Sequence, residues 1–214
     1  MDDTSSTQTS STHSSSTQTV STTGPDFEDF SSLPFPIYTQ RLVIRRIETT
    51  DKEAAGHMIA EENNAMIQWA GTTEPPDDLD RVLDHFTSDL TDIFLGIFLK
   101  DGEEELIGMG GIFTSVGQWS EVHYVLKEKH WGHGYCSEFV KALLEMWWNL
   151  PRDEREVDCP TMLYTGDSEQ KELLIATPLP GNSRSKKVLE KAGFHFRGLL
   201  DGREVWSATS NNEH

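Results

Sequence analysis

Residues 124–138, with the sequence YVLKEKHWGHGYCSE, decide the fold of this chain. They continue an apolar strand, turn sharply at Gly132 and Gly134, and enter a strongly apolar helix from about Cys136 to Asn149. The first N–H groups of a helix have no partner within it, and the helix dipole adds positive potential there. Glycine has no Cβ to keep an anion away from such a backbone. The stretch predicts either a phosphate-binding turn or an ordinary tight turn between a strand and a helix.

Two other phosphate-binding patterns do not fit this turn. The dinucleotide fingerprint Gly-x-Gly-x-x-Gly fails because Ser137 stands at the position of the third glycine. The P-loop pattern fails because no Gly-Lys-Ser/Thr follows. The turn is therefore assigned to neither class.

The rest of the chain reads as alternating strands and helices around this unit. Thr50 and Glu53 have the spacing of a capping box, the pairs Asp101–Gly102 and Asp201–Gly202 are hairpin signals, and Gly193 suits a helix C-terminus. Hydrophobic periodicity predicts strands at 41–47, 93–99, 106–113, 121–126, 173–177, 194–200 and 203–208, and helices at 50–63, 75–86, 136–149 and 182–193. The order predicts a mixed α/β domain with no internal repeat.

Composition divides the chain into an ordered domain and polar ends. Residues 1–24 are almost entirely Ser, Thr, Gln and Asp, and Val20 is the only sizeable aliphatic residue after Met1. Such a segment buries too little apolar surface to offset its ordering entropy. We predict a disordered tail over 1–26, a lead-in over 27–38, the domain over 39–209, and a second tail over 210–214. Residues 151–171 read as a polar insertion within the domain.

Charge and cysteine content limit the partners and the compartment. The net charge is -18, from 36 acidic and 18 basic side chains, which disfavours nucleic acid and anionic membranes and favours cationic partners such as amines. The first basic residue is Arg41, so neither a secretory signal nor a mitochondrial presequence is expected. Cys136 and Cys159 are too few for a disulfide scaffold. We expect a cytoplasmic protein, with the nucleus as the open alternative.

Four motifs occur in the order typical of one family. Lys129–Gly134 resembles the Arg/Gln-x-x-Gly-x-Gly/Ala pattern (motif A), with lysine at its first position, although His130 replaces an aromatic residue that is common just before the Trp-Gly pair. Asn182–Phe194 matches Asn-x-x-Ser-x-x-Val-Leu-Glu-Lys-x-Gly-Phe, and Thr39–Arg45 and Leu106–Gly108 match an opening strand and a third strand. The chain resembles the GNAT superfamily of N-acetyltransferases, and within it the branch that acetylates ribosomal-protein N-termini.

The resemblance implies an α/β (α+β) GNAT fold, with a mixed central sheet of about 6–7 strands flanked by about 4 helices. It implies acetyl-CoA as the acyl donor, with its pyrophosphate on the motif A turn and its pantetheine arm along the preceding strand, and no metal. The implied cofactor-binding residues are Tyr124, Val125, Leu126, Lys129, His130, Trp131, Gly132, His133, Gly134, Tyr135, Asn182 and Ser185.

Catalysis in this family is direct attack of an amine on the thioester, which needs a base and a donor to the departing sulfur. Glu121 is the candidate base, since the family often places a carboxylate on this strand; the alternative is a solvated glutamate at a strand edge. His123 shares the same strand face and is the second candidate. The resemblance implies a tyrosine near the end of the chain that protonates the leaving thiolate, but no tyrosine follows Tyr164 here, so either Ser185 or Asn182 would assist.

The acceptor and the oligomeric state stay open. The acceptor is either a protein N-terminus or a small cationic amine, and the short turn at Asp201–Gly202 favours an open acceptor mouth and hence a peptide or protein amine. The Pro-rich approach over 177–181 is longer than the family's usual one and could shift Asn182. The alternative function is a catalytically silent acyl-CoA-binding domain that acts as a sensor or scaffold. We expect a monomer or a homodimer.

Overall fold

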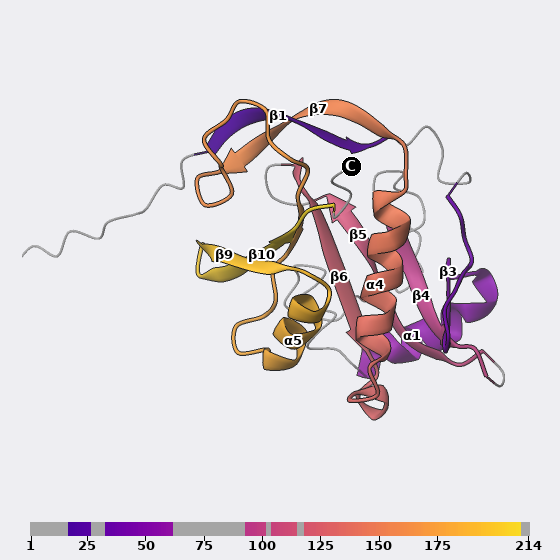
Figure 1. The fold of residues 1–214 in the computed structure, drawn as a ribbon. Helices are drawn as coiled ribbons and strands as arrows, with labels where there is room; N and C mark the ends of the chain where they lie inside the picture. The colour runs from indigo at the N-terminus through magenta and orange to yellow at the C-terminus, as the bar shows by residue number, and fades with distance from the viewer. Residues whose placement is uncertain (1–16, 27–32, 62–92, 102–103, 115–117, 211–214) are drawn as a thin grey trace, which may run out of the picture.

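A computed structural model describes residues 17–26, 33–61, 93–101, 104–114 and 118–210 (Figure 1). The helix predicted at 75–86 lies outside these residues, as do residues 1–16, the first half of the lead-in (27–32) and residues 211–214. None of the described helices is long and apolar enough to cross a bilayer.

Among the described residues, a mixed sheet of eight strands forms the centre of the fold, in the order β2-β3-β4-β5-β6-β8-β10-β9. Neighbouring strands are antiparallel except for the parallel pair β6 and β8. The predicted fold class is confirmed, and the sheet is wider than predicted because part of the lead-in forms the edge strand β2. The strands are β2 (Ile37–Tyr38), β3 (Leu42–Arg45), β4 (Ile93–Leu99), β5 (Leu106–Thr114), β6 (Ser120–Leu126), β8 (Leu174–Ala176), β9 (His195–Leu200) and β10 (Arg203–Ala208).

The described residues contain three α-helices: α1 (Lys52–Glu61), α4 (Tyr135–Trp148) and α5 (Ser183–Lys191). A short 3-10 turn, η2 (Thr49–Asp51), leads into α1. The predicted capping box of Thr50 and Glu53 is wrong, because the Asp51 carboxylate accepts the N–H of Glu48 instead, at 2.8 Å. The helices predicted at 136–149 and 182–193 are confirmed to within two residues at each end.

Apolar side chains pack on both faces of the sheet. Val122 and Leu126 of β6 belong to a cluster with Phe139 and Leu143 of α4, whereas Val125 packs against a second cluster that includes Met58 of α1. Helices α4 and α5 therefore cover one face and α1 covers the other (Figure 1). Strand β6 lies in the middle of the sheet with its side chains alternating between these two environments.

A separate two-stranded sheet corrects the predicted disorder. Strand β1 (Thr17–Pro25) pairs antiparallel with β7 (Arg152–Pro160) along its whole length, so the tail predicted over 1–26 is wrong for 17–25 and the polar insertion contains a strand. Val20 and Val157 are each 2 % exposed and pack with Trp119 in a third cluster. Neither strand is apolar by itself, but pairing directs the few apolar residues of both to one side.

Candidate active site

Strand β6, a glycine-containing turn and helix α4 form the predicted strand–turn–helix unit. A short 3-10 helix, η4 (Glu128–His130), follows β6, and Gly132 and Gly134 then adopt positive φ values of 81° and 83°. The first hydrogen bond of α4 runs from the N–H of Glu138 to the carbonyl of Gly134, at 3.1 Å. The amides before Glu138 in this helix have no partner within it. Their geometry suits an anion; that they bind the pyrophosphate remains a prediction.

Strands β6 and β8 separate immediately before this turn. Their parallel ladder contains only the pairs Ser120–Leu174 and Glu121–Ile175, although β6 continues to Leu126. Beyond Glu121, β6 therefore keeps a strand partner on the β5 side and has none on the β8 side within the described residues. An extended ligand could bind to this edge in the manner of an added strand. This separation supports the predicted position of the pantetheine arm.

The last position of β6 that pairs with β8 holds the candidate base. Glu121 is only 4 % exposed, so the alternative of a solvated glutamate is wrong. The hydroxyl of Thr177 donates a short hydrogen bond to its Oε1, and the Nε2 of His123 lies 3.6 Å from the same oxygen. The ring of His123 meets the ring of Phe113 edge-on, with 5.3 Å between centroids. A buried carboxylate needs such polar partners, and this one lies where the strands diverge.

The first turn of α5 faces the separated half of β6. Asn182 caps the helix by accepting the N–H of Ser185 at 3.0 Å. The hydroxyl of Ser185 lies 2.8 Å from the hydroxyl of Tyr124, which also donates to the Ser185 carbonyl at 3.3 Å. Burial strongly raises the pKa of Tyr124, so this phenol stays protonated and can donate. The side chain of Tyr124 was missed in the sequence, where only its backbone was assigned.

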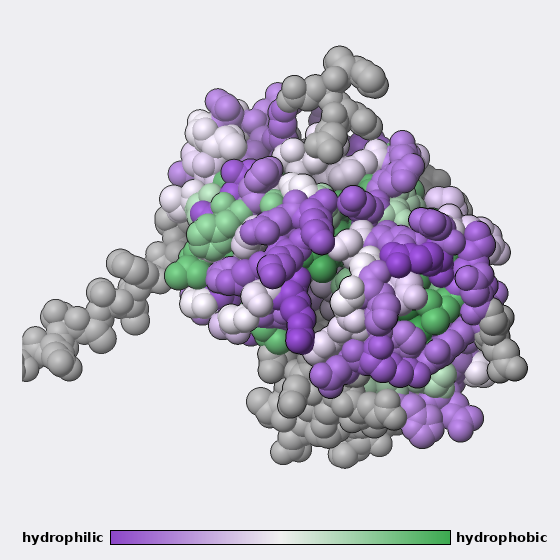
Figure 2. Space-filling model, turned by 60° about the horizontal axis from the view of Figure 1, so that its bottom comes forward, coloured by the Kyte–Doolittle hydropathy of each residue, from purple (hydrophilic) through white to green (hydrophobic). Residues whose placement is uncertain are grey.

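Side chains around the turn are mostly paired with protein groups. Lys129 lies 2.6 Å from Glu105 and His130 lies 3.4 Å from the same carboxylate, and the hydrogen bond from Lys129 holds the pKa of Glu105 below its usual value. The indole N–H of Trp131 donates to the carbonyl of Leu126 at 2.8 Å. From the side of this turn, the described surface is mainly hydrophilic, with separate hydrophobic patches (Figure 2). Phosphate binding would therefore rely on backbone amides more than on Lys129.

Two alternative roles for residues of the turn find no support in the described part of the chain. Burial raises the pKa of the Cys136 thiol to about 12, so this cysteine is a neutral packing residue rather than a nucleophile. No group of three or more His, Cys, Asp or Glu side chains among the described residues is arranged to hold a metal ion. His133 instead stacks on Tyr135, with 5.7 Å between ring centroids.

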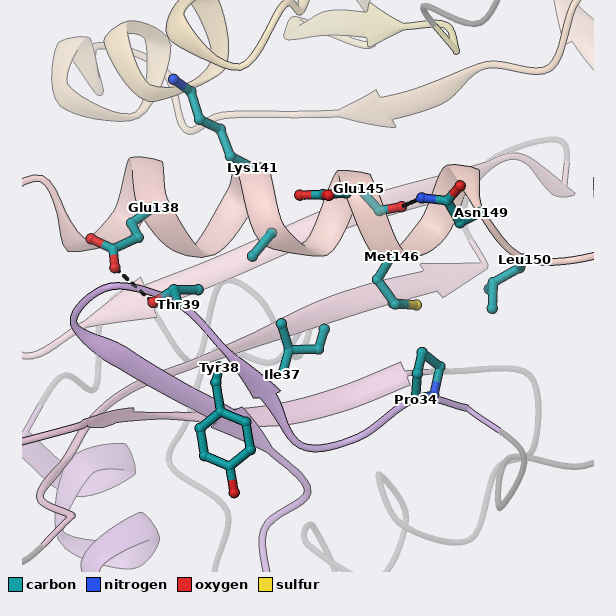
Figure 3. Close-up of a pocket in the computed structure, with 11 residues that line it drawn as sticks. Pro34, Ile37, Tyr38, Thr39, Glu138, Lys141, Glu145, Met146, Asn149 and Leu150 are labelled. Atoms are coloured by element: carbon teal, nitrogen blue, oxygen red, sulfur yellow. Dashed lines mark hydrogen bonds between the residues drawn. The ribbon is translucent and has the colours of Figure 1, made fainter.

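A groove of about 610 Å³ runs along the outer side of α4, next to the edge strand β2 (Figure 3). Ile37, Met146 and Leu150 provide apolar side chains, and Glu138 and Lys141 are among the polar ones. None of the predicted site residues lines this groove. It is distinct from the separation between β6 and β8.

The described sheet has one parallel pair, β6 and β8, which separates just before a glycine-containing helix start, a geometry that suits an extended, anionic ligand. The profile of the family described as "Acetyltransferase (GNAT) domain" matches residues 41–195, and the chain belongs to this family. It is an acyltransferase that uses acetyl-CoA as its donor. The family assignment confirms the resemblance found in the sequence motifs.

Solved structures show the same fold at low sequence identity. An acetyltransferase from Agrobacterium tumefaciens superposes with a TM-score of 0.60 at 21 % identity, covering 81 % of this chain and 94 % of the other. The microcin C7 self-immunity acetyltransferase MccE, in complex with acetyl-CoA and AMP, gives 0.59 at 14 % identity, with 84 % and 99 % coverage. RimL, a ribosomal L7/L12 α-N-protein acetyltransferase, gives 0.57 at 14 %, with 82 % and 93 % coverage. No curated protein matches the chain in sequence.

Proposed function

We propose that this protein transfers the acetyl group of acetyl-CoA to a primary amine, either a protein N-terminus or a small cationic amine. The observation that carries the proposal is the buried Glu121 at the last position where β6 pairs with β8, beside the separated strand edge that leads to the amides of α4. A proton acceptor and a donor-binding surface are thus adjacent on one strand. Both are needed for direct transfer between two bound substrates.

The backbone of this chain would hold the donor. Amides of the turn over 129–135 would bind the pyrophosphate, because the positive φ of Gly132 and Gly134 opens the backbone there. The backbone of Tyr124, Val125 and Leu126 would bind the pantetheine arm along the strand edge. Asn182 and Ser185, in the first turn of α5, would border that arm from the opposite side. These assignments use backbone groups where the strands separate and side chains where they meet.

Two groups would move protons during the transfer. Glu121, directly or through a water molecule, would take a proton from the amine as its nitrogen bonds to the thioester carbon. The carbon–sulfur bond then breaks, and the sulfur needs a donor. Ser185 carries the hydroxyl proposed for this task, and its hydrogen bond with Tyr124 orients it. His123 is the second candidate base, since it contacts the Glu121 carboxylate.

Charge supports the choice of a cationic acceptor. The net charge of -18 attracts amines in their protonated, cationic form, which they give up when the nitrogen attacks the thioester. RimL, which has the same fold, is an acetyltransferase of protein N-termini, and the short turn at Asp201–Gly202 fits a peptide acceptor. We propose a cytoplasmic location, in keeping with the two free cysteines, Cys136 and Cys159.

The test is calorimetric titration of the full chain with acetyl-CoA, followed by measurement of thiol release with a panel of amines. The full chain is needed because truncation before residue 26 would remove β1. The panel contains peptides with free N-termini, a polyamine and free amino acids. We expect micromolar-range binding and amine-dependent thiol release. Binding without thiol release from any acceptor would favour the silent acyl-CoA-binding domain, and release without an amine would indicate simple hydrolysis.

A further inference from the structure

The carboxylate of Glu138, in the first turn of α4, is bound by the segment that precedes β3. Its Oε1 accepts the hydroxyl of Thr39 at 2.6 Å (Figure 3) and also the backbone N–H of Arg41 at 2.8 Å. Its Oε2 accepts the Nε–H of Arg41 at 2.8 Å, and the Nη2 of Arg41 lies 2.7 Å away. Burial opposes ionisation of Glu138, but these hydrogen bonds hold its pKa below the usual value. These contacts join the segment before β3 to the start of α4.

The same arginine reaches beyond Glu138 into the turn. Its Nη1 donates to the carbonyl of His133 at 2.8 Å, and its guanidinium lies 4.6 Å from the centroid of the Tyr135 ring. A Cβ on Gly134 would lie 3.5 Å from its Nη2. One side chain thus contacts the turn on both sides of Gly134, one of its two glycines with a left-handed conformation.

The hydrogen bond from Arg41 to the His133 carbonyl fixes the orientation of the whole peptide between His133 and Gly134. In a trans peptide the C=O and N–H groups point in opposite directions, so a carbonyl turned towards Arg41 directs the N–H of Gly134 away from it. A reversal of this peptide would present an oxygen, in place of an N–H, to a bound phosphate. Because the charge of Arg41 is already paired with Glu138, its effect on an anion would come mainly through the shape of the turn.

A second arginine, Arg45 at the end of β3, provides a matched comparison. Arg45 also forms a forked pair, with Asp51, at 2.6 and 3.1 Å, and also lies over a ring, 3.8 Å from the centroid of Phe98. These contacts hold the start of α1 instead of the turn. The two side chains therefore share a chemistry but differ in the element that they fix.

We infer that Arg41 and Glu138 are positioning residues that hold the peptide between His133 and Gly134 in the orientation needed to bind the pyrophosphate of the donor. The inference rests on the proposed role of the turn. It assigns a function to two residues of the recognised motifs that the chemistry of transfer does not use. It also predicts that their loss affects donors with a pyrophosphate and spares donors without one.

The test compares acetyl-CoA with acetyl-pantetheine, which carries the same thioester but no pyrophosphate, in the wild type, Arg41→Ala and Arg45→Ala. We expect kcat/KM for acetyl-CoA to fall about twentyfold in Arg41→Ala through KM, while the value for acetyl-pantetheine changes less than twofold. Arg41→Lys should restore only part of the loss, because lysine cannot reproduce the fork. Arg45→Ala should leave the ratio of the two donors unchanged, even where its thermal unfolding midpoint falls.

Three outcomes would count against the inference. An equal loss for both donors in Arg41→Ala would mean that the residue supports the fold in general. No loss for either donor would mean that the turn holds its shape alone. If Arg41→Ala does not fold, Glu138→Gln serves instead, and an unchanged donor ratio in that variant would overturn the inference. Failure of the wild type to bind acetyl-CoA would instead overturn the proposed function itself, and the inference with it.

Discussion

The two ends of β6 differ in how the strand is paired. At its start, β6 has a strand neighbour on each side, Trp119 just before it is 2 % exposed, and Glu121 is buried with Thr177. At its end, β6 keeps only β5 as a strand neighbour among the described residues, and Trp131 in the following turn is 38 % exposed. One strand therefore passes from a closed environment to an open one within seven residues.

This difference separates two kinds of chemical group. Where β6 is paired on both sides, its backbone is engaged in the sheet and only a side chain can act, which suits a proton acceptor. Where the pairing on one side stops, backbone groups become available and a long ligand can bind along them. We expect substitutions at the open end of β6 to reduce donor binding and substitutions at its closed end to reduce turnover. The predictions below test this division.

The largest effect is expected at the open end, for Gly134→Glu. A carboxylate at the start of α4 would face the donor phosphates, and two like charges about 4 Å apart near a surface repel by about 4 kcal/mol, or roughly a thousandfold in affinity. Calorimetric titration with acetyl-CoA measures this loss. Gly202→Glu is the control, since Gly202 has a similar positive φ of 78° in the distant β9–β10 turn. Equal losses of acetyl-CoA affinity in the two variants would show that the turn is not part of the donor site.

At the closed end, Glu121→Gln should lower kcat by about a hundredfold or more, because a positioned base contributes about 10²–10⁴-fold. The dissociation constant for acetyl-CoA should stay within about twofold, since the change removes a charge and keeps the volume. Steady-state thiol release and calorimetry on the same preparation separate the two effects. Glu156→Gln, at an exposed position of β7, is the control. A full loss of turnover in His123→Ala, with Glu121→Gln still active, would transfer the role of base to His123.

Removal of β1 should destabilise the protein near the closed end of β6, because Val20 of β1 packs in one cluster with Trp119 just before β6. Deletion of residues 1–25 would expose Val157 and remove the buried Val20, at a cost of about 2 kcal/mol, or roughly thirtyfold in the folding equilibrium. Urea unfolding measures the cost, and acetyl-CoA binding by the folded fraction should be unchanged. Deletion of residues 1–16 is the control because it retains β1 and has a similar composition. If both deletions unfold at the same urea concentration, β1 contributes nothing to stability.

The smallest effect is expected where β6 faces α5. Tyr124→Phe removes the hydroxyl–hydroxyl bond to Ser185, together with the longer contact to the Ser185 carbonyl, and a net value of about 1 kcal/mol for the shorter bond corresponds to about a fivefold rise in KM for acetyl-CoA. Ser185→Ala removes the same bond and the proposed donor to sulfur, so kcat should fall as well. The double variant should resemble Ser185→Ala alone, because the two residues share one interaction. Additive losses in this cycle would show that the hydroxyls act independently.

Local features of the site could be predicted from the sequence. The turn around Gly132 and Gly134 was predicted because glycine spacing and the apolar pattern of the following helix are both short-range signals. The common strand face of Glu121 and His123 was predicted from the period of two residues, and the 3.6 Å contact between them confirms it. Motif matches then placed these elements in one family.

Long-range contacts could not be predicted in the same way. The hydroxyl of Thr177 meets Glu121 across 56 positions, and that of Ser185 meets Tyr124 across 61. Strand β1 was predicted to be disordered because its composition is polar and its partner strand lies more than a hundred residues away. No local pattern records which distant segment supplies the second half of such a contact.

The sequence by itself determined the glycine-containing turn, the order of most elements, and the family, because each depends on residue types at fixed short spacings. Only the tertiary structure decided that Glu121 is buried, that β6 and β8 separate after it, and that β1 pairs with β7. It also decided that Arg41 and Glu138 join the segment before β3 to the turn. The physical reason is that these features depend on the register and burial of segments brought together only when the whole sheet forms.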